Sequence, residues 1–283
     1  MSIQAHTAQQ PAVPTGFRAP LGARSLRLTA VIYLMTLVGI PIFVIAVMGL
    51  EGGLEPVLAD IANPIALGAL QLTLQTALIM TVINTVMGTL TAYVLVRYKF
   101  PGKQIFNAFI DLPFAIPTLV TGVMLVLLYG PQTVIGRFIE QATGQRVIFE
   151  PPGIVLALLF VSYPFVIRTI QPLLMQLNPS QEEAAQTLGA SDWTIFWRVI
   201  FPVIRPAIIT GALLSFARAL GEFGAIIIVA GNIPMRSQVA TVYVFGQIEN
   251  ANLAGAAGIS FILVLIAFIC TLAVDIFQRR YHA

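Results

Sequence analysis

Long apolar stretches without charges alternate with short polar segments along the chain, and this pattern predicts membrane-spanning helices. A spanning helix needs about 20 mostly apolar residues, because the hydrocarbon core of a bilayer is about 30 Å thick. The second apolar stretch begins near Ile61 and is longer than one crossing requires. The six predicted spans cover about residues 28–50, 65–96, 105–129, 153–177, 199–230 and 251–277. The sequence therefore predicts an all-α membrane protein with six transmembrane helices.

The composition indicates that lipid, and not water, surrounds most of this chain. Of its 283 residues, 58% are apolar and only 10% are charged, whereas soluble domains carry roughly 45–50% apolar and about 25% charged residues. Cys270 is the only cysteine, so a disulfide within the chain is excluded. The 15 basic and 12 acidic residues include no basic run. A lipid bilayer is therefore an expected partner and nucleic acid is not.

Lysines and arginines gather in alternate loops, and short loops rich in them stay on the cytoplasmic side of a membrane. The basic side is marked by Arg18, Arg24, Arg27, Arg97, Lys99, Lys103, Arg198, Arg205, Arg279 and Arg280. The opposite loops carry only Arg137, Arg146 and Arg236. We therefore expect both termini in the cytoplasm and a transmembrane domain over residues 28–278. Residues 1–27, rich in proline and polar residues, are expected to be a disordered tail, and residues 279–283 a second short tail.

Four charged residues lie inside the predicted spans: Asp111, Arg168, Arg218 and Glu222. A charge at the centre of a bilayer costs about 2.5–3.5 kcal/mol on insertion scales, so each needs a partner or a polar path. Arg218 and Glu222 are four residues apart, which places them on one face of a continuous helix. Asp111 and Arg168 are expected in the cytoplasmic halves of their helices, where they can pair. Both pairs are candidates either for holding helices together or for lining a transport pathway.

The chain lacks the motifs of common catalytic and cofactor sites. No glycine-rich phosphate loop followed by lysine occurs, and the chain has only two lysines. His6 and His282 lie near the two ends, so no metal-binding pair of histidines on one helix is present. No Gly-x-Ser-x-Gly motif for a nucleophilic serine occurs either. We therefore expect no catalytic residue, metal or cofactor in this chain.

A polar segment between the fourth and fifth predicted spans is expected to form a short cytoplasmic helix over about residues 181–190. A Ser and a Glu three residues apart predict a capping box at its start, and a glycine in the left-handed conformation predicts its end. Three further residues give it one small apolar face. The candidate residues are Ser180, Glu183, Ala184, Ala185, Leu188 and Gly189. This helix is either a docking element for another protein or an ordinary amphipathic connector.

Several motifs in this loop and in the spans resemble those of known transport proteins. The cytoplasmic loop signature of ABC importer permeases is similar to Glu183-Ala184-Ala185, Gly189, Val199, Phe201 and Pro202, with Val and Phe where Ile and Leu are usual. Segments 111–117, 164–169 and 216–225 look like those of the sulfate and molybdate permease group. Segments 168–172 and 230–234 look most like the T component of the sulfate/thiosulfate permeases, with the W component as a close alternative.

The resemblance implies an inner-membrane permease subunit that imports sulfate or thiosulfate by alternating access, and it implies that the loop helix is a coupling helix. The implied partners are a second, W-type permease subunit, a dimer of ATP-binding subunits that holds ATP and Mg²⁺, and a periplasmic sulfate/thiosulfate-binding protein. The absence of a phosphate loop fits this division of labour. Two alternatives stay open, namely a permease for another oxyanion such as molybdate or tungstate, and a transporter or channel driven by an ion gradient.

Overall fold

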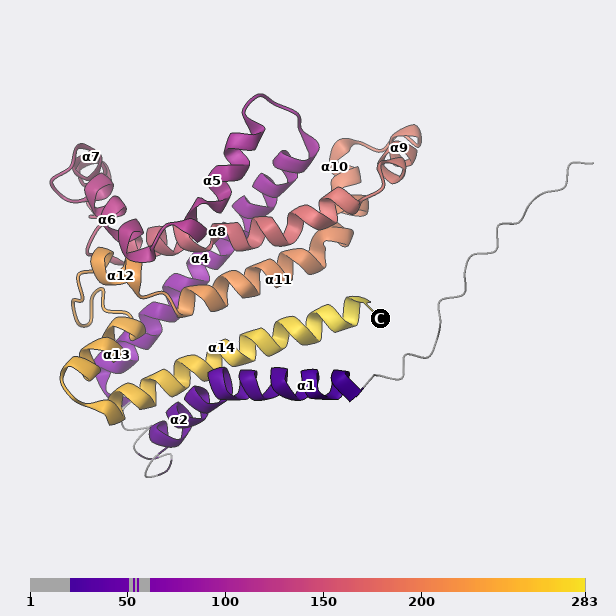
Figure 1. The fold of residues 1–283 in the computed structure, drawn as a ribbon. Helices are drawn as coiled ribbons and strands as arrows, with labels where there is room; N and C mark the ends of the chain where they lie inside the picture. Colours follow the sequence, from indigo (N-terminus) through magenta and orange to yellow (C-terminus); the bar gives the residue numbers. More distant parts are fainter. Residues whose placement is uncertain (1–20, 51–52, 54, 56–61, 283) are drawn as a thin grey trace, which may run out of the picture. The chain divides into compact units, whose positions relative to one another are not determined.

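The computed structural model describes residues 21–50, 53, 55 and 62–282, and every regular element in those ranges is a helix (Figure 1). The chain divides into two compact units, residues 1–44 and 45–283. The first unit contains α1 (Leu21–Leu34), the π-helical turn η1 (Met35–Gly39) and the beginning of α2 (Ile40–Gly49). The second unit contains the remaining helices and all four clusters of buried apolar side chains.

The helices of the second unit differ widely in length, from 4 to 34 residues. The helices that follow the first unit along the chain are α4 (Pro64–Arg97), α5 (Lys103–Ala115), α6 (Thr118–Tyr129), α7 (Val134–Thr143), α8 (Pro151–Gln176), α9 (Pro179–Thr187), α10 (Asp192–Ile195), the π-helical turn η2 (Phe196–Ile200), α11 (Phe201–Leu220), α12 (Gly224–Val229), α13 (Ala240–Glu249) and α14 (Leu253–His282).

Helix α8 packs against both α4 and α11, and small residues allow this close approach. A Cβ atom added at Gly88 of α4 would lie 2.9 Å from Cγ1 of Val166, and one added at Gly211 of α11 would lie 3.0 Å from the Cα of the same valine. Val166 is fully buried at this crossing. Close packing of small residues is the usual way in which membrane helices associate, because lipid provides no hydrophobic driving force between them.

Five helices in the described ranges are long and apolar enough to cross a membrane: Arg24–Gly49, Pro64–Arg97, Pro151–Gln176, Asp192–Leu220 and Leu253–Ile276. Helices α5 and α6 pass the same test as a pair, although they are bent by 114° at the break between them. The prediction of six spans is therefore confirmed if this bent pair counts as one crossing.

The third predicted span, residues 105–129, is not the continuous helix that its apolar pattern indicated. Ile116 is extended, with φ −82° and ψ 127°, and Pro117 begins the next helical segment. The proline ring disfavours the helical conformation of the preceding residue, and proline lacks a backbone donor. Pro113 lies inside α5 without interrupting it. The break therefore falls at the second of the two prolines in this span.

The fifth predicted span, residues 199–230, also differs from a single helix. Helix α11 ends at Leu220, and α12 begins at Gly224 after a non-helical turn. The two glycines that flank this turn, Gly221 and Gly224, have low helix propensity. An apolar pattern alone does not reveal such an interruption, because the turn is only three residues long, from Gly221 to Phe223, and lies within a long apolar stretch.

The two predicted tails are partly helical. Residues 1–20 lie outside the described residues, but residues 21–27 belong to α1, and α14 continues through residue 282. Residues 21–27 are therefore helical and not disordered as predicted, whereas the cytoplasmic tail over residues 279–283 stays a prediction. Arginine and leucine are good helix formers, and residues 21–27 and 277–282 contain no proline. No proline in these segments therefore stops a helix that the neighbouring span has already nucleated.

The loops of the second unit gather at two ends of its helix bundle. Near the end of α8 that leads into α9, an ion pair joins Arg97, at the end of α4, to Glu182 of α9. Near the start of α8, an ion pair joins Glu150 to Arg236, which follows α12. Figure 1 shows α9 and α10 at one end of α8, with α7 and α12 at the other. The loops predicted to be cytoplasmic thus share one end; which side of the membrane that end faces stays a prediction.

Candidate functional site

The short helix α9 begins earlier than the sequence predicted. Asn178 is its N-cap, and the side-chain oxygen accepts a hydrogen bond from the backbone N–H of Ser180 at 3.1 Å, while Pro179 occupies the first turn. The predicted capping box between Ser180 and Glu183 is therefore wrong, because Ser180 already lies inside the helix. Asparagine is among the best N-cap residues, and proline is pre-organised for the first helical position.

The predicted end of α9 is confirmed. Gly189 adopts the left-handed conformation with φ +80°. Its N–H donates to the carbonyl of Gln186 at 2.9 Å, and the N–H of Ala190 donates to the carbonyl of Ala185 at 3.0 Å. These two bonds form a Schellman motif, which satisfies the last carbonyls of the helix. A Cβ atom at Gly189 would meet no atom within 4 Å, so the backbone conformation alone calls for glycine here.

The three small or apolar residues of α9 do not form one face, as the sequence had suggested. Ala185 packs against the buried cluster at this end of the bundle. Ala184 and Leu188 are exposed, and the side chain of Leu188 is 89% exposed. Trp193 of α10 is also 71% exposed. Exposed apolar side chains that gather beside an ordered helix are typical of a surface that another protein covers.

An aromatic cluster supports the segment that follows α9. Trp193 and Trp197 have ring centroids 5.5 Å apart, and Trp197 lies 4.7 Å from the ring of Phe201. Phe196 meets Tyr93 of α4 edge to face, with ring centroids 5.6 Å apart. Such pairs contribute about 0.5–1.5 kcal/mol beyond the burial of their area. The cluster therefore fixes α10 and η2 to the end of α4.

The ion pair between Arg97 and Glu182 is a contact that sequence reasoning missed. Arg97 is in the last turn of α4 and Glu182 in the first turn of α9. The helix dipole favours a cation at the C-terminal end of α4 and an anion at the N-terminal end of α9. The two side chains are only 20% and 19% exposed. The sequence contained this signal, because each charge lies at the helix end that favours its sign, but it does not show that the two ends meet.

The predicted pairing of Asp111 with Arg168 is present. Nε and Nη2 of the arginine donate to the two carboxylate oxygens of Asp111 at 2.7 and 2.6 Å. Nη1 also donates to Oε1 of Gln171 at 2.6 Å, and Nη2 to the carbonyl of Asn107 at 2.9 Å. Asp111 is 54% exposed, so the network lies at the surface of this subunit and not in its core. Asn107 and Gln171 were missed, although each lies one helical turn from a member of the pair.

Arg218 and Glu222 also pair, but not on a shared helix face. The Nη2 of Arg218 lies 2.8 Å from Oε2 of Glu222, while Glu222 stands in the turn after α11. Its Oε1 accepts the backbone N–H of Ala225 at 2.9 Å, and its carbonyl accepts the hydroxyl of Thr241 at 2.9 Å. Glu222 is 2% exposed. The correction is that this carboxylate bridges two helices at a break. In the described part of the chain, no hydrogen bond or ion pair joins these residues to Asp111 and Arg168.

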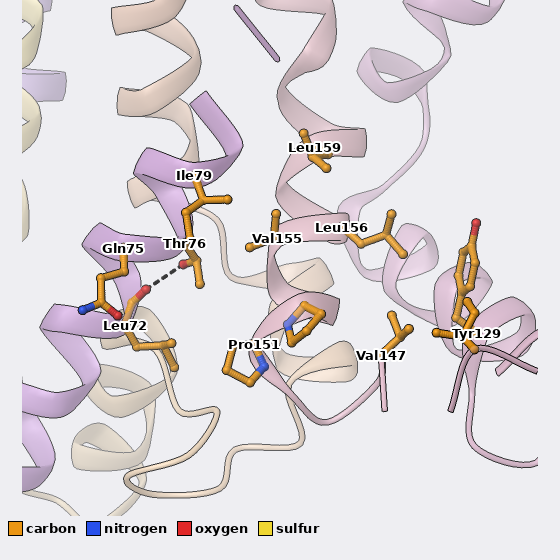
Figure 2. Close-up of a pocket in the computed structure, with 12 residues that line it drawn as sticks. Leu72, Gln75, Thr76, Ile79, Tyr129, Val147, Pro151, Val155, Leu156 and Leu159 are labelled. Carbon is orange, nitrogen blue, oxygen red and sulfur yellow. Dashed lines mark hydrogen bonds between the residues drawn. The ribbon is translucent and has the colours of Figure 1, made fainter. Parts of the chain in front are cut away.

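An apolar groove is lined by residues of α4 and α8, together with Tyr129 of α6 and Ile139 of α7 (Figure 2). Its volume is about 600 Å³, and its lining includes Leu72, Val155 and Leu159. The hydroxyl of Thr76, also in the lining, donates to the carbonyl of Leu72 at 2.7 Å and is thus already satisfied. Among the described residues that line this groove none is ionised, so the lining offers no charge to a charged substrate. It fits lipid chains or the apolar surface of another subunit.

A polar cavity of about 590 Å³ lies at the end of the bundle opposite α9. It is lined by two acid–base pairs, Glu140 with Arg146 and Glu150 with Arg236. The Glu150 carboxylate, through its hydrogen bond and its charge, raises the pKa of Arg236 above the ordinary value. Each arginine is therefore neutralised by a glutamate, and the cavity carries no excess charge for an anion.

No group of three or more His, Cys, Asp or Glu side chains in the described residues is close enough to hold a metal ion. What the described structure does present is a bundle of spans, two broken helices with buried or paired charges, and an exposed short helix at one end. These features define a class, a multi-pass helical membrane subunit whose exposed α9 is suited to contact another protein.

The comparison with protein families identifies the particular family. The chain belongs to the binding-protein-dependent transport system inner membrane components, whose family model matches residues 84–283. It is thus a transport subunit and a multi-pass membrane permease of an ABC importer.

Curated relatives resemble the chain over most of its length. It is 46% identical to the probable sulfate transport system permease protein cysT of Chlorokybus atmophyticus, over 77% of this chain and 76% of the relative. It is 41% identical to the CysT protein of Synechocystis, over 89% and 88% of the two chains. The CysW protein of the same organism is 40% identical over 89% and 91%. Identity alone therefore separates the T and W types only weakly.

Solved structures show the same fold. A chain in the crystal structure of a bacterial alginate ABC transporter, in complex with an alginate pentasaccharide-bound periplasmic protein, aligns with a TM-score of 0.74 at 18% identity over 91% of this chain and 94% of that chain. A chain of the MetNI methionine ABC transporter, in an inward-facing conformation, aligns with a TM-score of 0.55 at 18% identity over 80% and 98% of the two chains. At these identities the likeness concerns the fold alone.

Proposed function

We propose that this chain is the T-type permease subunit of an ATP-driven importer that carries sulfate, and with it thiosulfate, across the inner membrane. The observation that carries the proposal is the identity of 41–46% to relatives named as sulfate permeases, over three quarters or more of both chains. The family and the alignment with ABC importer chains supply the general mechanism, which is transport by a complex.

In this proposal α9 receives a partner ATPase. The helix is capped at both ends by side-chain and backbone hydrogen bonds, so it is a rigid element. The exposed side chains of Leu188 and Trp193 supply an apolar contact surface. Because this chain has no phosphate loop, a dimer of ATP-binding subunits holds ATP and Mg²⁺. The complex further contains a W-type permease and a periplasmic sulfate/thiosulfate-binding protein.

The two charge pairs have different roles in this proposal. Arg168 is saturated by Asp111, Gln171 and Asn107, so it has little capacity left for an anion and serves to join α5 to α8. Arg218 places one nitrogen on Glu222, and a third of its side chain is exposed. Its free donors make it the better candidate to contact a tetrahedral dianion in the pathway, since guanidinium donors match the spacing of oxyanion oxygens.

Uptake of labelled sulfate tests the proposal. A strain that lacks this gene is complemented with the wild-type chain together with its partner subunits, and uptake is measured with unlabelled sulfate, thiosulfate or molybdate as competitors. We expect ATP-dependent uptake that sulfate and thiosulfate suppress and that molybdate suppresses far less. Molybdate as the strongest competitor would assign another oxyanion. Uptake that persists in ATP-free vesicles under an ion gradient would contradict an ATP-driven importer.

A further inference from the structure

The segment that runs from α9 to η2 contacts α4 at two points, one before and one after Gly189. Before the glycine, Glu182 pairs with Arg97 in the last turn of α4. After the glycine, Phe196 meets Tyr93, one turn earlier on α4, with ring centroids 5.6 Å apart and the rings perpendicular. The covalent chain connects α9 to α8 and, through α10 and η2, to α11. The contact with α4 is thus additional to these connections and is made by side chains alone.

The burial of the ion pair and its position at two helix ends both strengthen the attraction between Arg97 and Glu182. Both side chains are about four-fifths buried, so water screens their attraction only partly. Each charge also lies at the helix end whose dipole favours it. Glu183, the next residue on α9, is exposed and has no ion pair in the described structure. The two neighbouring glutamates therefore have different surroundings: Glu182 faces α4, and Glu183 faces outward.

Helix α4 extends from the contact with α9 to the opposite half of the subunit. Its 34 residues correspond to a length of about 51 Å at 1.5 Å per residue. Near its other end, the buried hydroxyl of Thr73 accepts the backbone N–H of Ala240 at 2.8 Å. The next residue, Thr241, donates to the carbonyl of Glu222, in the turn between α11 and α12. One stiff helix thus links α9 to the break that contains the buried carboxylate.

We infer that Arg97 and Glu182 are positioning residues that couple movement of α9 to α4, and through Thr73, Ala240 and Thr241 to the turn at Glu222. This inference rests on the proposed function, because it assumes that a partner ATPase moves α9. Helix α4 is continuous and can transmit displacement along its axis, whereas the connection through α11 begins in a π-helical turn, where the regular hydrogen-bond pattern changes. The pair is not part of the surface that the ATPase contacts.

Charge reversal and charge exchange test the inference in the complete complex. Arg97→Glu and Glu182→Arg each place like charges together, whereas the double variant restores an opposite pair with exchanged signs. Lys99→Glu is the matched control, because Lys99 is an exposed cation two residues after Arg97 with no partner in the described structure. Co-purification of the ATPase, ATP hydrolysis and uptake of labelled sulfate are measured for each in proteoliposomes.

We expect both single variants to retain the ATPase and to hydrolyse ATP, but to take up about tenfold less sulfate per ATP than the wild type, while the double variant recovers most of this ratio. Single variants that couple as well as Lys99→Glu would overturn the inference. So would loss of the ATPase from the single variants, which would make the pair a docking contact, or a double variant no better than either single.

A milder variant and the wild-type complex separate a failure of the inference from a failure of folding or of the proposed function. Should a reversal prevent insertion of the permease, Glu182→Gln removes the charge at nearly constant shape, and the same fall in sulfate per ATP is expected, smaller in size. Normal coupling in Glu182→Gln would then overturn the inference. Failure of the wild-type complex to transport sulfate would instead overturn the proposed function, so the two failures are distinguishable.

Discussion

At the scale of single residues, Glu222 is a buried charged side chain that joins α11 to α12 across the break between them. Its carboxylate accepts from Arg218 and from the backbone of Ala225, and its carbonyl accepts from Thr241. A carboxylate that is 2% exposed is stable only while such partners compensate for lost hydration. The turn between α11 and α12 therefore depends on this one side chain.

Removal of Arg218 alone should harm the protein more than replacement of both members of the pair. Arg218→Ala leaves a buried carboxylate without its cation, at a cost of about 1–3 kcal/mol. In Arg218→Ala/Glu222→Gln the neutral amide oxygen can still accept the N–H of Ala225, so most of this loss should be recovered. Thermal unfolding of the purified permease in detergent measures the difference. A double variant no more stable than Arg218→Ala would show that the charge pair does not support the turn.

At the scale of elements, the chain combines helices that its pattern predicts with breaks that its pattern does not. The spans from residues 65–96 and 153–177 match α4 and α8 to within about two residues, because long apolar stretches leave little choice of structure. The breaks near Pro117 and Glu222 lie inside apolar stretches of the same kind. The two breaks also meet, since a Cβ atom at Gly122 of α6 would lie 2.8 Å from the carbonyl oxygen of Ala225 in α12.

The end of α9 provides a prediction at this scale. Gly189→Val has room for its side chain but must adopt a left-handed conformation, which costs roughly 1–2 kcal/mol. The variant should insert normally and yet bind the ATPase poorly or uncouple ATP hydrolysis from uptake, because the geometry of α9 changes. Gly189→Asn should behave nearly as the wild type, since asparagine tolerates this conformation better. Co-purification and sulfate uptake per ATP are the measurements.

Gly102 offers a matched control for this prediction. It has the same φ of +80° and equally open surroundings, but it precedes α5 and not α10. Gly102→Val should therefore carry a similar conformational penalty without the effect on coupling. Equal coupling in the two valine variants would indicate that α9 is an ordinary connector.

At the scale of the whole molecule, the positions of the loops make the topology testable. The Lys99 loop and α9 share one end of the helix bundle, joined by the pair of Arg97 with Glu182, and the loop from residue 137 to 150 lies at the other. The distribution of lysine and arginine predicts that the first end is cytoplasmic and the second is outside, as is the loop from Glu51 to Asp60, which lies mostly outside the described residues.

Single cysteines can decide this orientation. With Cys270 replaced by serine, a cysteine at the exposed position of Gln145 should react with a membrane-impermeant maleimide in intact spheroplasts. A cysteine at Gln186, which is equally exposed in α9, should react only after the membrane is permeabilised. The reverse pattern would invert the predicted topology and remove α9 from the reach of a cytoplasmic ATPase.

The sequence by itself determined the all-helical membrane class, most of the spans and the rigid end of α9 at Gly189. These properties follow from local physics: the length of apolar stretches, the conformational freedom of glycine and the cost of unpaired charges in lipid. It also indicated that Asp111 and Arg168 pair, because two isolated charges of opposite sign in neighbouring spans have few other partners.

Only the tertiary structure decided where the broken helices meet and which charges join separate elements. The ion pair of Arg97 with Glu182 depends on two helix ends that are 85 residues apart in sequence but adjacent in space. The capping of α12 by Glu222 depends on a three-residue turn that interrupts a long apolar stretch. Contacts between distant segments are set by how whole helices pack, and no local pattern along the chain encodes that packing.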